Sequence, residues 1–277
     1  MQETLKEYEN FIWKKLFNLF FDLVVSKEKR KTLYLGLCYC QISRLFGVDE
    51  IPLAELKKCL KKYLIDFDNY PWRDYLLEWE IFYLRDGERN FIKGKEILFY
   101  DPTPDSAFSI DSRYGFMKHT ICQRIYKYWS FVERFKKSFP PQDSKEFFDT
   151  VVEIFNYGLP REAYLLLENY LPVIAKEDLL LYRVFRSLTQ LGYLIESKDY
   201  PNADKELEVL LNLLDEYKGY LKPYPYDFHK LEKDLNRMSK YLENPRSKLY
   251  PPLLKVFKKK PKQGFFKRFF SFFRKTN

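Results

Sequence analysis

The sequence predicts an all-α protein with two helical-bundle domains, followed by a basic C-terminal tail that forms an amphipathic helix. Apolar residues recur at helical spacing along nearly the whole chain. Glycine is scarce, at 9 of 277 residues, while hydrophobic residues reach 46%, enough for buried cores. Lys and Glu are abundant, which also fits a thermophilic source.

The first predicted domain spans residues 1–141. Apolar spacing predicts its helices at residues 3–25, 30–46, 52–66, 72–86 and 114–138. Pro52 stands where a first-turn proline belongs, and Gly47 stands where a helix ends. In residues 95–115, prolines, Asp and Ser interrupt the pattern, so we expect an ordered loop there with a short extended piece at Ile97–Tyr100.

The second predicted domain spans residues 142–243. It begins after "SFPP" (138–141), because two prolines end the preceding helix and Asp143 or Ser144 can cap the next one. Its end is set by Glu243, the last acidic residue of the chain. The helices are expected at residues 143–157, 160–171, 176–197, 201–217 and 227–243.

Four stretches of this domain resemble the helical bundle of the domain of unknown function 309 family. They are "LPREAYLLLENYL" (159–171), "YRVFRSLTQLGYLI" (182–195), "DYPNADKELEVLLNLLDEY" (199–217) and "YDFHKLEKDLNRMSKYL" (226–242). The residues that match the family motifs are Glu162, Ala163, Glu168, Gln190, Asn202, Ala203, Asp227, Leu231, Asp234 and Leu235. The resemblance covers about residues 147–243 and implies a bundle fold.

The resemblance breaks at one motif position. Where the family has a His-Glu pair, this chain has Tyr164 and Leu165, so any chemistry that the pair supplies in relatives is not expected here. A tetratricopeptide-like helix pair is an alternative interpretation of the same region, although no repeat of 34 residues follows it.

Metal, disulfide and targeting signals are not recognised in the sequence. The four cysteines, Cys38, Cys40, Cys59 and Cys122, fit neither a zinc ribbon nor a disulfide framework, because Cys38 and Cys40 point about 200° apart on a helix. The two histidines, His119 and His229, fall in different predicted domains, so no metal site is expected. No secretory signal or membrane-spanning segment is recognised, and we expect a cytoplasmic protein.

No motif in the sequence identifies a reaction or a cofactor. Neighbouring carboxylates, such as Asp66 and Asp68, are expected to lie on a solvated face. The chain is therefore expected to be non-enzymatic and to need no cofactor. The alternative is an unrecognised enzyme with its site in the first domain, around Trp72, Glu78 and Trp79.

The tail, residues 244–277, holds eleven Lys or Arg and no acid, whereas the rest of the chain carries 37 basic and 39 acidic residues. On a helix, its six phenylalanines fall between about −20° and 140° from Phe265, and its basic residues fall between about 180° and 300°. The apolar face is Phe265, Phe266, Phe269, Phe270, Phe272 and Phe273, and the basic face is Lys267, Arg268, Arg274 and Lys275. A lysine-rich lead-in precedes them, with Lys255, Lys258, Lys259, Lys260 and Lys262.

Three partners fit this tail. Segregated aromatic and basic faces are typical of a helix that lies on an anionic membrane surface, which would hold the protein peripherally on the inner face of a membrane. The Phe face could instead dock on the protein's own body, on a second copy or on another protein. Nucleic acid fits less well, because doubled phenylalanines on one face suit lipid better than spaced, unpaired bases.

Overall fold

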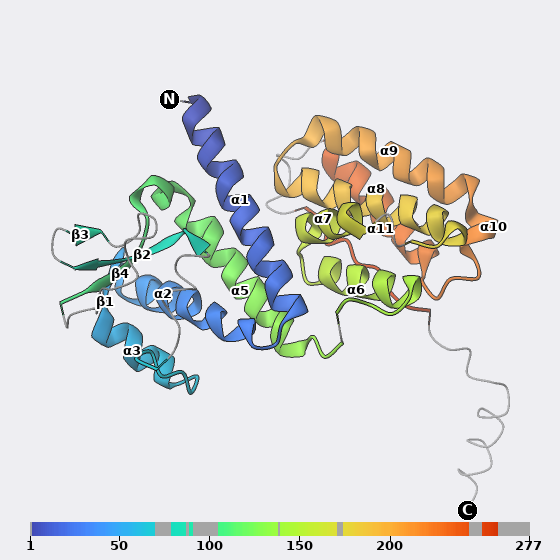
Figure 1. Ribbon diagram of the computed structural model, residues 1–277. Helices are drawn as coiled ribbons and strands as arrows, with labels where there is room; N and C mark the ends of the chain where they lie inside the picture. Colours follow the sequence, from blue (N-terminus) through green and yellow to red (C-terminus); the bar gives the residue numbers. More distant parts are fainter. Residues whose placement is uncertain are drawn as a thin grey trace, which may run out of the picture. The chain divides into compact units, whose positions relative to one another are not determined.

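The computed structural model describes residues 2–69, 79–86, 89–90, 105–137, 139–170, 174–243 and 251–259. The chain divides into two compact units, Met1–Gln142 and Asp143–Asn277. Helices dominate both units, which confirms the predicted all-α class (Figure 1). The predicted tail helix lies outside the described residues.

Unit 1 is built on three long helices. They are α1 (Gln2–Val25), α2 (Leu33–Phe46) and α5 (Lys118–Arg134). Aromatic rings fill the space between α1 and α5: the Phe20 ring lies 5.1 Å from that of Tyr128 and 5.5 Å from that of Phe131. The shorter elements are the 3-10 helices η1 (Lys29–Thr32) and η3 (Ser112–Met117), and helix α3 (Leu53–Lys61).

Unit 1 also contains a small antiparallel sheet, which the sequence interpretation missed. Its order is β1-β4-β2-β3, with β1 at Glu50–Pro52, β2 at Phe82–Asp86, β3 at Arg89–Asn90 and β4 at Ala107–Ile110. The helix predicted at 72–86 is therefore wrong over β2, and the loop predicted at 95–115 is wrong over β4. The proposed extended piece at Ile97–Tyr100 lies outside the described residues.

Burial against α2 explains why these short segments are strands. Phe82 and Phe108 stack with ring centroids 5.2 Å apart, and Tyr39 of α2 meets both rings edge-on. The strand pairing sets Leu84 opposite Phe108, so apolar side chains from β2 and β4 enter one core with the helix. Packing across the sheet outweighs the helical spacing that the sequence shows.

Two disulfides tie α2 to its neighbours, which corrects the expectation of no disulfide framework. Cys38 is bonded to Cys59 of α3, and Cys40 is bonded to Cys122 of α5. The divergence of Cys38 and Cys40 on α2 is the reason: each thiol faces a different packed helix. The spacing of Cys38 and Cys40 excludes a disulfide between these two residues, but it lets each of them bond to a cysteine of a different helix.

The described residues of unit 2 form a bundle with five main helices. They are α6 (Ser144–Asn156), α7 (Pro160–Tyr170), α8 (Leu179–Glu196), α9 (Tyr200–Glu216) and α11 (Phe228–Leu242), with the short helices η5 (Lys176–Asp178) and α10 (Lys218–Leu221). Along the chain, α6 packs on α7, α7 on α8, and α8 on α9, while α11 returns to pack on α9. Antiparallel neighbours of this kind follow from the short connections.

Aspartate caps set the starts of three of these helices. Asp143, Asp199 and Asp227 each accept a hydrogen bond from a backbone N–H in the first turn that follows. Gly158 adopts a left-handed φ of 74° after α6, and Pro160 then opens α7. The capping predicted at Asp143 is confirmed.

Candidate functional site

Residues 251–259 form a segment of extended chain that lies against the helices of unit 2, and we call it the strap (the red stretch in Figure 1). Its contacts are with α6, with residues 222–227 before α11, and with α11 itself. The sequence interpretation placed these residues in the tail. The structure therefore brings the described part of the tail onto the folded bundle.

Backbone groups hold the strap on two sides. The N–H of Asp227 donates to the carbonyl of Phe257 at 2.7 Å, and the N–H of Lys259 donates to the carbonyl of Pro225, also at 2.7 Å. On the other side, the Asn156 amide donates to the carbonyl of Val256 at 2.8 Å and accepts from its N–H at 2.9 Å. The strap therefore makes one isolated antiparallel bridge, between Tyr226 and Lys258, and is held on its other side by a side-chain amide.

Lys258 is paired with a half-buried acid. Its ammonium lies 2.6 Å from Oδ2 of Asp149, whose side chain is only 14% exposed. The other carboxylate oxygen, Oδ1, accepts a hydrogen bond from the hydroxyl of Tyr226 at 2.9 Å. Burial raises the pKa of Tyr226 far above its ordinary value, and the Asp149 charge raises it further, so this hydroxyl remains a donor.

Lys259 and Phe257 complete the contact. The Lys259 ammonium donates to the carbonyls of Lys222 at 2.7 Å and Tyr224 at 2.6 Å. Lys230 of α11 lies over the Phe257 ring, 3.2 Å from its centroid. Of the three lead-in lysines that the structure describes, Lys258 and Lys259 thus bind the protein itself, and Lys255 is half-buried.

The remaining predicted tail ligands lie outside the described residues. They are Lys260, Phe265, Phe266, Lys267, Arg268, Phe269, Phe270, Phe272, Phe273, Arg274 and Lys275. Their amphipathic arrangement stays a prediction from the sequence, and so does their contact with a membrane or a partner.

A second polar cluster surrounds Arg186 on α8. Its Nε lies 2.7 Å from Glu168 of α7, and its two terminal nitrogens donate to Gln190 and to the hydroxyl of Tyr164. Tyr182 donates to the same Glu168 oxygen at 3.1 Å. Burial opposes the charge of Arg186, but Glu168 and the neighbouring tyrosines outweigh it, so the pKa of Arg186 is raised.

This cluster joins residues that the family resemblance singles out separately. Glu168 and Gln190 match the motifs, and Tyr164 occupies the position of the family's histidine. Arg186 was not identified from the sequence, although Tyr182, Arg186 and Gln190 are four residues apart and share one face of α8. The observed contacts give the cluster a role in binding α7 to α8.

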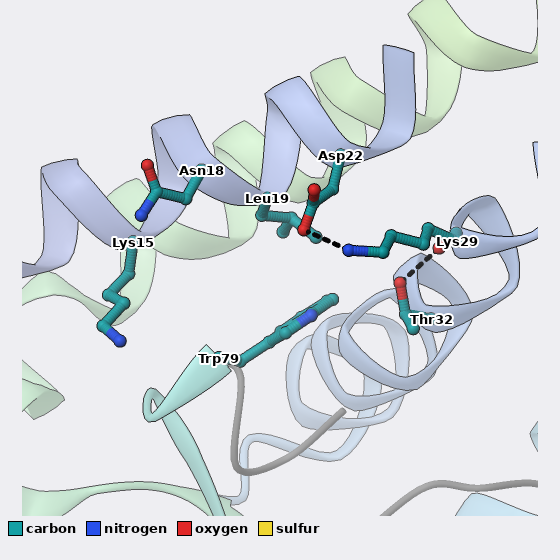
Figure 2. Close-up of a pocket in the computed structure, with 7 residues that line it drawn as sticks. All are labelled: Lys15, Asn18, Leu19, Asp22, Lys29, Thr32 and Trp79. Carbon is teal, nitrogen blue, oxygen red and sulfur yellow. Dashed lines mark hydrogen bonds and ion pairs between the residues drawn. The ribbon is translucent and has the colours of Figure 1, made fainter. Parts of the chain in front are cut away.

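A small cavity in unit 1 lies beside Trp79, one of the residues of the enzymatic alternative. It is lined by Lys15, Asn18, Leu19, Asp22, Lys29, Thr32 and Trp79 and has a volume of about 30 Å³. Figure 2 shows the Trp79 indole between α1 and the turn that carries Lys29 and Thr32, with Lys29 paired to Asp22 at 3.0 Å. The space suits a water molecule, not a substrate. Trp72 and Glu78 lie outside the described residues.

The described part of the chain shows neither a metal-binding cluster nor a membrane-spanning helix. No group of three or more His, Cys, Asp or Glu side chains there could hold a metal ion. Among the same residues, no helix combines the length and the hydropathy that a bilayer crossing needs.

The chain is similar to a protein of Aquifex aeolicus (strain VF5) described as an "Uncharacterized protein". The two are 28% identical over an alignment of 235 residues, and the alignment covers 82% of this chain and 71% of the relative. No family model matches the chain, and no solved structure matches it. The resemblance to the domain of unknown function 309 family therefore stays a prediction.

Proposed function

We propose that this protein is a non-enzymatic, helical interaction protein that attaches peripherally to an anionic membrane surface through the part of its tail that follows the strap. The observation that carries the proposal is the composition of the tail, in which all six phenylalanines fall on one helical face and no acid interrupts the basic face. The corresponding location is the cytoplasm, with the protein held on the inner face of the membrane.

The strap contacts change which residues would touch lipid. Because Lys258 and Lys259 bind Asp149 and backbone carbonyls, we assign the lipid contact to the cations that follow them. These are Lys260, Lys262, Lys267, Arg268, Arg274 and Lys275. Each contributes on the order of 1 kcal/mol near an anionic leaflet. The strap would then link the lipid-bound part of the tail to the helices of unit 2.

The test is sedimentation of the full-length protein with vesicles. We expect binding to vesicles that contain anionic lipid and much weaker binding to neutral vesicles. Changing Phe266, Phe269, Phe270 and Phe273 to Ser should abolish binding while the net charge stays at +9. The matched control is Phe46→Ser with Phe116→Ser, which removes two exposed phenylalanines of unit 1 and should leave binding unchanged.

Other results select the other partners. Binding that survives the four serine substitutions and weakens only with salt would indicate a purely electrostatic tail. A wild-type protein that ignores anionic vesicles but shifts a single-stranded oligonucleotide would replace the membrane with nucleic acid. A protein that does neither would place the Phe face against protein.

A further inference from the structure

The strap lies against a surface formed by α6, residues 222–227 and α11, and we call this contact surface the groove. The groove offers a carbonyl at Pro225, an N–H at Asp227 and both ends of the Asn156 amide. These groups satisfy the backbone of an extended segment on both edges. Main-chain bonds of this kind give affinity for any extended peptide, and side-chain contacts decide which one binds.

Alternate residues of the strap enter the groove. Leu254 and Val256 are 8% and 3% exposed, whereas Leu253, on the opposite side of the extended chain, is 69% exposed. Two apolar side chains spaced two apart are therefore buried. This spacing is the first part of the sequence pattern that the groove selects.

Charge gives the second part of the pattern. Two residues after Val256, the Lys258 ammonium meets the Asp149 carboxylate at 2.6 Å. The adjacent Lys259 ammonium meets the carbonyls of Lys222 and Tyr224. Negative charge and carbonyl dipoles at these positions favour cations and disfavour acids.

We infer that this groove is a peptide-binding site, and that its ligand is an extended segment of a partner protein with apolar side chains at two alternate positions and lysine two residues further on. The strap occupies the site in cis. The inference goes beyond membrane attachment and does not depend on it, because every contact that supports it lies between the strap and unit 2.

Because the strap is covalently linked to the bundle, it competes with any free peptide for the site. A tethered ligand acts at an effective concentration on the order of millimolar. A free peptide with the same contacts must compete with that concentration. Peptide binding is therefore expected to be weak in the intact chain and strong once the link between strap and bundle is cut.

The first experiment cuts the link after the full chain has folded. Residues 244–250 are replaced with a seven-residue viral protease site, and the uncut chain is checked for the wild-type unfolding transition. After cleavage, without lipid, the fragment from residue 251 onward should co-elute with the rest of the chain in gel filtration. A synthetic peptide of residues 251–260 in excess should displace it. A fragment that separates at once would overturn the inference.

The second experiment tests the groove with matched asparagines. In the cut protein, Asn156→Ala should weaken binding of the labelled 251–260 peptide about tenfold, because it removes two hydrogen bonds to Val256. Asn169→Ala is the control, since Asn169 donates only to a carbonyl of its own helix and should leave the peptide affinity unchanged. Equal effects of the two substitutions would contradict the assigned site.

The third experiment tests the sequence pattern of the peptide, and whether a second copy of the chain supplies the bound segment. A peptide with Val256→Asp and Lys258→Glu should lose more than tenfold in affinity for the cut protein, and unchanged binding would contradict the proposed pattern. The intact chain should remain monomeric as its concentration rises. A concentration-dependent dimer that these two substitutions abolish would replace the partner protein with a strap exchanged between two copies.

Discussion

The ionisation of the Tyr39 hydroxyl makes the free energy of unfolding of unit 1 depend on pH in the alkaline range. Its side chain is 1% exposed and its hydroxyl donates to the carbonyl of Asp49 at 3.1 Å. Burial raises the pKa of Tyr39 to about 12, from an ordinary value of 10.0. The neutral phenol is therefore the form that the folded core accepts.

The pH dependence follows from that pKa. Below pH 10 the contribution of Tyr39 is fully present, because the hydroxyl is protonated in both the folded and the unfolded chain. Between pH 10 and about 12 the folded chain retains the proton that the unfolded chain loses, so the free energy of unfolding falls with rising pH.

Tyr39→Phe should therefore make this fall less steep, by up to about 1.4 kcal/mol per pH unit. Urea unfolding across this pH range measures the slope. Tyr220→Phe is the control, because Tyr220 is 73% exposed, and it should leave the profile as in wild type. Identical slopes for wild type and Tyr39→Phe would contradict the assigned role of burial.

At the scale of the element, the contact between α7 and α8 depends on one glycine. A Cβ at Gly192 would lie 2.7 Å from the Cβ of Pro160 and 3.0 Å from the Phe155 ring, and both neighbours are rigid. The start of α7 therefore approaches α8 closely only because Gly192 has no side chain. This contact also positions Tyr164 near Arg186.

Gly192→Ala should destabilise the protein by about 1–3 kcal/mol, since the added methyl overpacks the contact between α7 and α8. Gly219→Ala is the matched control, because a Cβ there meets no atom within 4 Å. Alanine at 219 should be neutral or stabilise α10 by about 0.5 kcal/mol. Denaturant unfolding of both variants measures the difference, and equal stabilities would refute the packing argument.

The two disulfides of unit 1 close loops of different length. Cys38 and Cys59 are 21 residues apart, whereas Cys40 and Cys122 are 82 apart. In the chain-entropy view, the longer loop restricts the unfolded state more, by about 1 kcal/mol.

Replacing Cys40 and Cys122 with Ala should thus lower the free energy of unfolding by about 1 kcal/mol more than replacing Cys38 and Cys59. Urea unfolding under non-reducing conditions compares the two double variants with wild type. The reverse order would indicate that native packing around the bonds, not loop closure, sets their contribution.

The elements that sequence patterns predict well are those governed by local rules. Helix starts at Asp143 and Pro160 follow from capping chemistry that needs only a few neighbouring residues. Strands β2 and β4 were missed because their partners are distant in sequence, and the apolar residues of β2 also fit helical spacing. The disulfides were missed for the same reason, since each bond reaches another helix.

The candidate site could be predicted only in part. The Asp149–Lys258 pair joins residues 109 positions apart, so no local pattern identifies it. The strap did carry a signal: Leu254 and Val256 are buried and alternate with less buried residues at the spacing of a strand. The many lysines of this segment obscure that alternation in the sequence.

At the scale of the whole molecule, the strap affects where unit 2 ends. Leu254 and Val256 are buried, and the Asp149 carboxylate uses Lys258 as a partner. A bundle that stops at Glu243 lacks these contacts. Burial of each apolar side chain contributes about 1.5–3 kcal/mol, from which the ordering of the strap backbone subtracts.

A fragment of residues 143–259 should therefore unfold cooperatively and be more stable than a fragment of residues 143–243, on the order of 2 kcal/mol. Thermal and urea unfolding of both fragments measure the gap. Adding Val256→Asp to the longer fragment is the control and should remove most of its advantage. Equal stability of the two fragments would mean that the strap contributes nothing to the bundle.

The sharing of α2 by both disulfides also determines how unit 1 would respond to proteolysis. The two bonds close overlapping covalent rings, so one cut anywhere between Cys40 and Cys122 leaves two pieces that are still joined. A nicked chain would migrate as one band on a denaturing gel without reductant and as two bands with it. A cut in this region would therefore escape detection on a denaturing gel that is run without reductant.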